Sequence, residues 1–77
     1  MFEDFRLRIF MAVAEKGSFT LAAKALGVSQ PAVSQNIAEL EKSLGAELFL
    51  RRKGSVTLTP KGAAFKEYAG RILYWYT

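Results

Sequence analysis

Residues 18–45 read SFTLAAKALGVSQPAVSQNIAELEKSLG, and this stretch decides the fold. Ser18 and Ser29 each stand directly before an apolar periodic segment, which is where helix N-caps are found. Gly27 and Gly45 follow the two segments, at positions that favour a left-handed helix end. Pro31 falls in the first turn of the second segment, where a missing N–H is tolerated. The pattern therefore predicts two short helices joined by a tight turn.

The second predicted helix carries an apolar stripe on one side and a polar face on the other. The stripe consists of Val33, Ile37, Leu40 and Leu44. At about 100° per residue, the opposite side holds Pro31, Ser34, Gln35, Ala38 and Lys42. This face is small in profile, and it carries no acidic side chain because Glu39 and Glu41 fall on the flanks of the helix. A groove lined by phosphates requires such a face. Reading of the DNA major groove is the functional hypothesis. The alternatives are that Ser34 and Gln35 are ordinary solvated residues and that Ser29 acts only as a helix cap.

A first helix is predicted over residues 2–16, and Gly17 ends it. Its apolar residues share one side and comprise Phe2, Phe5, Leu7, Ile9, Phe10, Val13 and Ala14. They span roughly 200°, which is wider than the stripe of about 100° that covers one core. We therefore expect two partners for this helix, namely the core and, as a candidate, a second subunit. The short helix after it is expected to face the core through Ala22, Ala23 and Leu26.

Two apolar–polar alternations, at residues 48–50 and 56–58, predict a small hairpin. The residues between them, Arg51-Arg52-Lys53-Gly54-Ser55, give this hairpin a basic tip. Three adjacent cations repel one another unless an anion neutralises them. Contact with DNA phosphates or with the minor groove is the functional interpretation, and a solvated turn is the alternative.

A last helix is predicted to begin after the hairpin, with Thr59 as its N-cap and Pro60 at its first position. Gly62 stands where a capping box would have an acid. The helix has a seam of apolar residues at Phe65, Tyr68, Ile72 and Trp75, flanked by Ala69, Leu73 and Tyr76. Spacings of this kind are typical of coiled coils. Because the sequence stops inside this helix, we expect a truncation there.

Length and composition exclude several function classes. The 77 residues suffice for one small domain. They include no Cys and no His, which excludes disulfides, structural zinc sites and His-based catalysis within this chain. No cofactor is expected. The longest apolar run, residues 9–14, is far too short to span a membrane, so a soluble cytoplasmic protein is expected.

Residues 1–47 carry a net charge of −1 and residues 48–77 a net charge of +5. A basic half favours a polyanion such as nucleic acid or an anionic membrane, although it also fits a solubilising surface.

The stretch SFTLAAKALGVSQPAVSQNIAELEKSLGAELFLRRKGSVTLTPKG closely resembles the N-terminal winged helix-turn-helix domain of LysR-type transcriptional regulators. The resemblance covers about residues 5–62 of the chain. The matching elements are Ser18-Phe19-Thr20, Ala22-Ala23, Leu26, Val28-Ser29-Gln30-Pro31-Ala32-Val33-Ser34, Ile37, Leu40-Glu41, Leu44-Gly45, Leu48-Phe49, Arg51, Leu58-Thr59 and Gly62. It implies a mainly α fold with a small two-stranded wing over residues 1–59. Residues 60–77 would be the start of a linker (dimerisation) helix, with the family's effector domain, and its small-molecule coinducer, absent.

The resemblance also implies a function. A bacterial transcription regulator of this family would bind double-stranded DNA sequence-specifically, as a homodimer on an interrupted palindromic operator, and would not be an enzyme. By position, the expected DNA base contacts are Gln30, Pro31, Ser34 and Gln35. The expected DNA backbone contacts are Thr20, Ser29, Arg51, Arg52 and Lys53. The expected dimer interface comprises Phe65, Tyr68, Ala69, Ile72, Leu73, Trp75 and Tyr76.

Two other function classes compete with DNA binding. A pure protein-interaction module would explain the wide apolar arc of the first helix and the aromatic seam of the last. An enzyme has little support, because the seven carboxylates show no obvious pairing and Ser34 has no base near it in the sequence.

Overall fold

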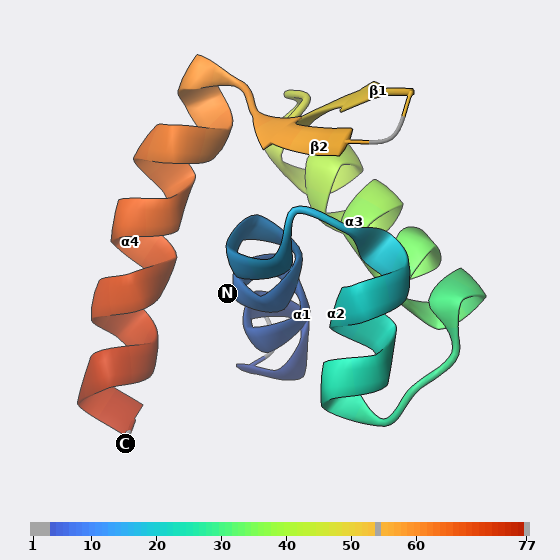
Figure 1. Cartoon of the computed structure of the whole chain (residues 1–77). Coiled ribbons are helices and arrows are strands. Elements are labelled where there is room, and N and C mark those ends of the chain that lie inside the picture. The colour runs from blue at the N-terminus through green and yellow to red at the C-terminus, as the bar shows by residue number, and fades with distance from the viewer. Residues whose placement is uncertain (1–3, 54, 77) are drawn as a thin grey trace.

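The structure, a computed structural model, describes residues 4–53 and 55–76, and side chains as far as residue 74. The elements along the chain are α1 (Asp4–Lys16), α2 (Phe19–Leu26), α3 (Gln30–Leu44), β1 (Phe49–Arg52), β2 (Ser55–Leu58) and α4 (Pro60–Tyr76). Four helices and one hairpin thus confirm the predicted mainly α fold with a wing. In Figure 1, α4 stands on one side of α1, while α2 and α3 lie on the other side and the hairpin lies above.

Helix α1 is the centre of the fold and packs against α2, α3, α4 and β2. Its buried side chains are Leu7, Ile9, Phe10 and Val13. The wide apolar arc that suggested a second subunit is therefore covered by elements of the same chain. Phe5 was expected within this arc but is 47% exposed, because it lies just beyond the edge of the buried sector. Phe2 lies outside the described residues.

The predicted caps and turn around α2 and α3 are confirmed. The Ser18 Oγ accepts a hydrogen bond of 3.0 Å from the backbone N–H three residues on, and the Ser29 Oγ accepts one of 3.2 Å in the same way. Gly27 and Gly45 end the two helices with φ of 71° and 64°. Only glycine adopts these angles without steric cost, so the ends of both helices of the α2–α3 helix pair depend on a glycine.

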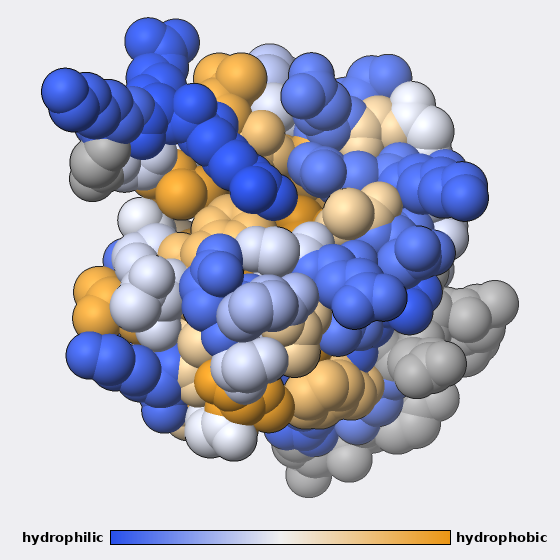
Figure 2. Space-filling view, turned by 90° about the vertical axis from the view of Figure 1, so that its right-hand side faces the viewer, coloured by the Kyte–Doolittle hydropathy of each residue, from blue (hydrophilic) through white to orange (hydrophobic). Residues whose placement is uncertain are grey.

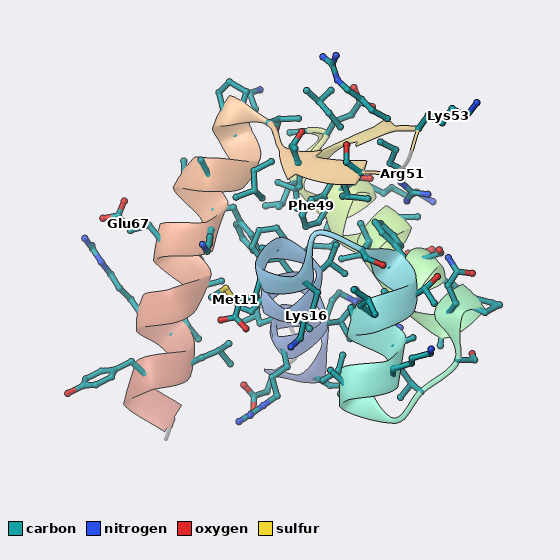
Figure 3. All side chains as sticks on the ribbon, viewed as in Figure 1. Met11, Lys16, Phe49, Arg51, Lys53 and Glu67 are labelled. Carbon is teal, nitrogen blue, oxygen red and sulfur yellow. The ribbon has the colours of Figure 1, made fainter. Side chains whose placement is uncertain are left out.

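A series of aromatic rings crosses the core and links four elements. Phe10 of α1 lies 5.0 Å from Phe65 of α4 and 5.2 Å from Phe49 of β1, measured between ring centroids. Phe49 in turn lies 6.1 Å from Phe19 of α2, at an interplanar angle of 74°. Figure 3 shows Phe49 between the hairpin and α1. Edge-to-face pairs of this kind add to the energy of apolar burial, so the rings fix the hairpin over the helices.

The hairpin is a two-stranded antiparallel wing whose register runs from Phe49↔Leu58 to Arg52↔Ser55. The predicted hairpin is confirmed, but its strands extend further toward the tip than predicted, and Leu48 lies just before β1. Arg51 and Arg52 were placed in the tip, whereas they belong to β1 and pair with residues of β2. Backbone pairing therefore holds these two cations in an extended conformation.

A carboxylate joins the end of α3 to the wing. The Glu41 side chain accepts hydrogen bonds from the N–H groups of Leu48, at 2.7 Å, and of Phe49, at 3.4 Å. The Leu48 carbonyl accepts from the Thr59 N–H at 3.0 Å. The Thr59 Oγ1 accepts from the Gly62 N–H at 2.9 Å, which confirms the predicted cap of α4. The end of α3, both wing strands and the start of α4 thus meet at one junction.

We expect Glu41→Ala to lower the free energy of unfolding by about 2 kcal/mol, because it leaves two partly buried N–H groups without their charged acceptor. Chemical denaturation of the purified domain measures this loss. Glu39→Ala is the matched control, since Glu39 is exposed on the same helix, and it should change stability by less than about 0.5 kcal/mol. Equal losses for the two variants would show that the junction does not depend on the Glu41 carboxylate.

Candidate nucleic-acid interface

The first two turns of α3 expose a polar surface. Gln30, Pro31 and Gln35 are exposed, and Ser34 is half-buried. The Gln30 Nε2 donates a hydrogen bond of 2.8 Å to the Ser34 Oγ. Both side chains keep further donor and acceptor capacity, because an amide and a hydroxyl each make more than one hydrogen bond. The structure thus brings the four predicted base-contact residues together on one surface.

The two acidic side chains of α3 lie away from this surface. The carboxylate of Glu41 is turned toward the start of the wing, where it binds the N–H groups of Leu48 and Phe49. Glu39 is exposed, and its wheel position is on the flank of α3. A phosphate approaching the first turns of α3 would therefore meet partial positive charge from the helix N-terminus without a facing carboxylate.

The predicted phosphate contacts near the two helix starts are exposed as well. Thr20 lies in the first turn of α2 and Ser29 directly precedes α3. The Ser29 Oγ accepts a backbone hydrogen bond as the cap of α3, and its hydroxyl proton is still available to a phosphate oxygen. A capping role and a DNA contact are thus compatible for Ser29.

The wing presents its cations beside these helix starts. Arg51, Arg52 and Lys53 are all exposed. Figure 3 shows Arg51 on the side of the wing that faces α2 and α3, whereas Lys53 projects outward. In the part of the chain that the structure describes, the ion pairs are Arg8 with Asp4 and Arg71 with Glu67, and neither involves the wing. The wing charges are therefore available to an external anion.

An open cleft of about 380 Å³ separates the wing from the helix pair. It is lined by Gly17, Ser18, Phe19, Gln30, Arg51, Arg52, Ser55 and Val56. In Figure 2, which faces this side of the molecule, hydrophilic side chains project at the top, at the level of the wing. The cleft brings one predicted base contact and two predicted phosphate contacts to the same place.

Two side-chain contacts that position the elements of this surface carry no local signal in the sequence. The Arg51 Cζ lies 4.2 Å from the centroid of the Phe19 ring, a contact between residues 32 positions apart that no local pattern signals. Asn36 donates to the Ala32 carbonyl at 2.8 Å and accepts from the Arg6 Nε at 3.4 Å, which ties α1 to α3. Polar residues often stand beside an apolar stripe, so the sequence did not indicate that Asn36 contacts α1.

The seam on α4 faces α1. Phe65 is 8% exposed and Ala69 has no exposed surface in the single chain, so neither has much surface for a second subunit. Ile72 and Leu73 are half-buried and pack against the same core, whereas Tyr68 is 54% exposed. The apolar spacing thus marks the stripe that α4 turns toward its own core. The side chains of the remaining predicted interface residues, Trp75 and Tyr76, lie outside the described ones.

The outer face of α4 has a different composition. Ala63, Ala64, Glu67, Tyr68, Arg71 and Tyr74 are exposed there. Glu67 and Arg71 form an ion pair of 3.1 Å on this face, and Figure 3 shows Glu67 pointing away from α1. Small, aromatic and oppositely charged side chains on one helix face are suited to packing against another helix.

Other kinds of site find no support in the described residues. They contain no group of three potential ligands among His, Cys, Asp and Glu that could hold a metal ion. None of the helices, over their described residues, is both long and apolar enough to cross a membrane.

A glycine-linked helix pair under a basic antiparallel hairpin defines a winged helix-turn-helix protein. Residues 5–63 match the family described as bacterial regulatory helix-turn-helix protein, lysR family. The chain therefore belongs to the LysR family of transcription regulators and is not an enzyme domain.

Curated relatives and solved structures agree with this assignment. The chain is 54% identical over 67 residues to the HTH-type transcriptional regulator BudR of Klebsiella aerogenes, covering 87% of this chain and 47% of that protein. It is 51% identical over 71 residues to TfdS of Cupriavidus pinatubonensis, covering 91% and 24%. It thus spans about half or less of the length of these relatives.

Solved structures of LysR-family domains match the whole fold. The CbnR DNA-binding domain in its DNA complex superposes with a TM-score of 0.94 at 43% identity, covering 97% of this chain and 86% of that one. The BenM DNA-binding domain bound to its catB site 1 DNA gives 0.91 at 42% identity, covering 95% and 82%. This likeness confirms the predicted winged helix-turn-helix class.

Proposed function

We propose that the chain binds double-stranded DNA sequence-specifically, with the first two turns of α3 in the major groove and the wing on the neighbouring backbone. The observation that carries the proposal is the exposed, acid-free face of α3 beside three wing cations that have no acidic partner among the described residues. It is supported by the likeness to the CbnR and BenM domains, whose structures contain DNA.

Each predicted contact has a chemical role in this proposal. Gln35 and Gln30 can donate to and accept from base edges such as those of adenine, and Ser34 can serve either kind of site. Pro31 can contact a thymine methyl group. The phosphate contacts come from the starts of the two helices and from the wing, and comprise Thr20, Ser29, Arg51, Arg52 and Lys53.

We further propose that the regulator acts in the cytoplasm as a homodimer on an interrupted palindrome. Residues 60–77 would be the start of the dimerisation helix, and a small-molecule coinducer would bind a separate effector domain. In the single chain, α4 stands apart from the groove-facing helices (Figure 1) and exposes aromatic and small side chains on its outer face. Pairing through this face would leave α3 and the wing of both subunits free for DNA.

The DNA-binding proposal is tested by titrating the protein against a duplex from the promoter region of its own gene and against a random duplex of equal length. Affinity for both should fall steeply with added salt, since neutralised phosphates release counterions. The promoter duplex should bind more tightly than the random one. Absence of binding to either duplex at low salt would refute the proposal.

Gln35→Ala should relax the preference at one base pair of each half-site, because removing a pair of hydrogen bonds to a base edge removes about 1–3 kcal/mol of discrimination. Competition with a set of operators, each changed at one position, measures the effect. Arg52→Ala is the comparison, and it should weaken specific and random DNA by similar factors. Equal losses of affinity on every sequence for Gln35→Ala would place this side chain away from the bases.

Tyr68→Asp should shift the protein toward monomer, because it places a charge in the middle of the proposed contact between the α4 helices of the two subunits. Sedimentation equilibrium over a range of protein concentrations measures the dimer dissociation constant. We expect it to rise at least tenfold, which corresponds to about 1.4 kcal/mol. Phe5→Asp, an exposed aromatic residue on α1, is the control and should leave the constant unchanged.

A protein-interaction module is the second candidate function, favoured by the exposed aromatic residues Tyr68 and Tyr74 on α4. Dimerisation fits both candidates, so size alone does not separate them. Sedimentation with and without operator DNA does, since only a DNA-binding protein gains mass from the duplex.

A further inference from the structure

We propose that Phe19 is a positioning residue for DNA binding, whose ring holds the Arg51 guanidinium in the cleft between wing and helix pair, ready for a DNA phosphate. The inference rests on the DNA-binding function proposed above. It gives a role to a side chain that is a candidate neither for base contact nor for phosphate contact.

The contact has the geometry of a cation–π interaction. The Arg51 Cζ lies 4.2 Å from the Phe19 ring centroid, within the range of about 6 Å over which the ring attracts a cation. Phe19 is only 7% exposed, whereas Arg51 is an exposed residue of β1. The ring therefore serves as a largely buried platform, and the guanidinium lies over it at the surface.

The core fixes this platform in place. Phe19 meets Phe49 at a centroid distance of 6.1 Å and an angle of 74°, and Phe49 packs on the fully buried Phe10. A ring held in this way has little freedom to move. An arginine resting on it has already lost part of its side-chain entropy, so less is lost when a phosphate binds.

The contact with Phe19 leaves N–H donors of Arg51 available. A guanidinium carries five N–H donors, so a ring on one side of the group leaves several of them for a phosphate. Neither ion pair of the described residues includes Arg51, so its positive charge is not neutralised by an acid there. The ring orients the group while its charge and donors stay free.

The location also suits a phosphate. Ser18 and Gln30, at the starts of α2 and α3, line the same cleft as Arg51. Ser18 directly precedes α2 and Gln30 is the first residue of α3, so the partial positive charge of helix N-termini lies at the edge of this cleft. A phosphate held by Arg51 would therefore lie near backbone N–H groups as well as near the guanidinium.

A double-mutant cycle tests the inference with the folded protein and the promoter duplex. Phe19→Leu keeps apolar volume but removes the π face, and Arg51→Ala removes the cation. Phe19→Leu should weaken binding about two- to fivefold, and it should have no effect when Arg51 is already Ala. The salt slope should stay unchanged in Phe19→Leu, whereas Arg51→Ala should lower it by about one per subunit.

Two further variants keep the test decisive if Phe19→Leu folds poorly. Phe19→Tyr retains the π face and should bind as the unchanged protein does. Arg51→Lys keeps the charge but loses the planar fork, so it should weaken binding while the salt slope stays the same. A parallel cycle of Phe19→Leu with Arg52→Ala should be additive, which separates a specific effect on Arg51 from general loss of stability.

The possible results separate the positioning role of Phe19 from the proposed DNA-binding function. Additive effects of Phe19→Leu and Arg51→Ala on affinity, or Phe19→Tyr as weak as Phe19→Leu, would overturn the positioning role while DNA binding by the unchanged protein still stands. Failure of the unchanged protein to bind any duplex at low salt would overturn the proposed function, and the positioning role with it.

Discussion

Gly62→Ala is expected to lower the free energy of unfolding by about 3 kcal/mol or more, a large share of the roughly 4–12 kcal/mol typical of a 77-residue domain. A Cβ on Gly62 would overlap the Leu48 carbonyl oxygen, lie 2.9 Å from its carbonyl carbon and come within 3.1 Å of the Leu58 Cδ2. The Leu48 carbonyl cannot retreat easily, because it accepts the Thr59 N–H at the junction of wing and α4. Thermal unfolding should show a midpoint lower by about 12–24 °C.

Gly70→Ala is the matched control, on the same helix. A Cβ on Gly70 would meet nothing within 4 Å, leaving aside the helix's own backbone, so this change should stabilise α4 by about 0.5–1 kcal/mol. Opposite signs for the two substitutions would therefore separate a local clash from a general intolerance of α4. If Gly62→Ala were as stable as the unchanged protein, α4 could not begin against Leu48 as described.

Local signals in the sequence were sufficient for most of the fold. Ser18, Ser29, Gly27 and Gly45 predicted the ends of α2 and α3, because caps and left-handed glycines act within one turn of the chain. The exposed polar face of α3 followed from the apolar stripe on its other side. The same logic predicted the wing and the cap of α4.

The differences arise where distant elements meet. The absence of a capping-box acid at Gly62 was visible in the sequence. Its cause, the carbonyl of Leu48 just before β1, comes from a distant part of the chain. The seam through Phe65 and Ala69 was read as a dimer interface because periodicity marks a buried stripe without naming its partner, and here that partner is α1. The contact of Phe19 with Arg51 likewise depends on how the wing folds over α2.

Neutralising the wing should have the largest effect on DNA binding. The triple change Arg51→Gln, Arg52→Gln and Lys53→Gln removes three cations proposed to bind phosphates in each subunit, while keeping long polar side chains. At about 0.1 M salt, we expect affinity to fall on the order of 10³-fold or more, for promoter and random duplexes alike. The slope of log affinity against log salt should decrease by about 0.9 for each phosphate that is no longer neutralised, or about 5 for a dimer. Fluorescence anisotropy over a range of salt concentrations measures both quantities.

An equal change of net charge elsewhere shows whether the location of the charges matters. Arg8→Gln on α1, together with Lys61→Gln and Lys66→Gln on α4, removes three cations outside the wing and outside the proposed base and phosphate contacts. Helix α4 stands on the other side of α1 from the helix pair (Figure 1). This control should weaken binding by less than about tenfold, because exposed charges more than about 10 Å from the DNA are largely screened at 0.1 M salt. Sedimentation confirms that both variants keep the oligomeric state of the unchanged protein. Equal losses of affinity for the two triple variants would mean that overall charge, rather than phosphate binding by the wing, drives association. A wing variant that lost only its preference for the promoter duplex would mean instead that the wing reads bases.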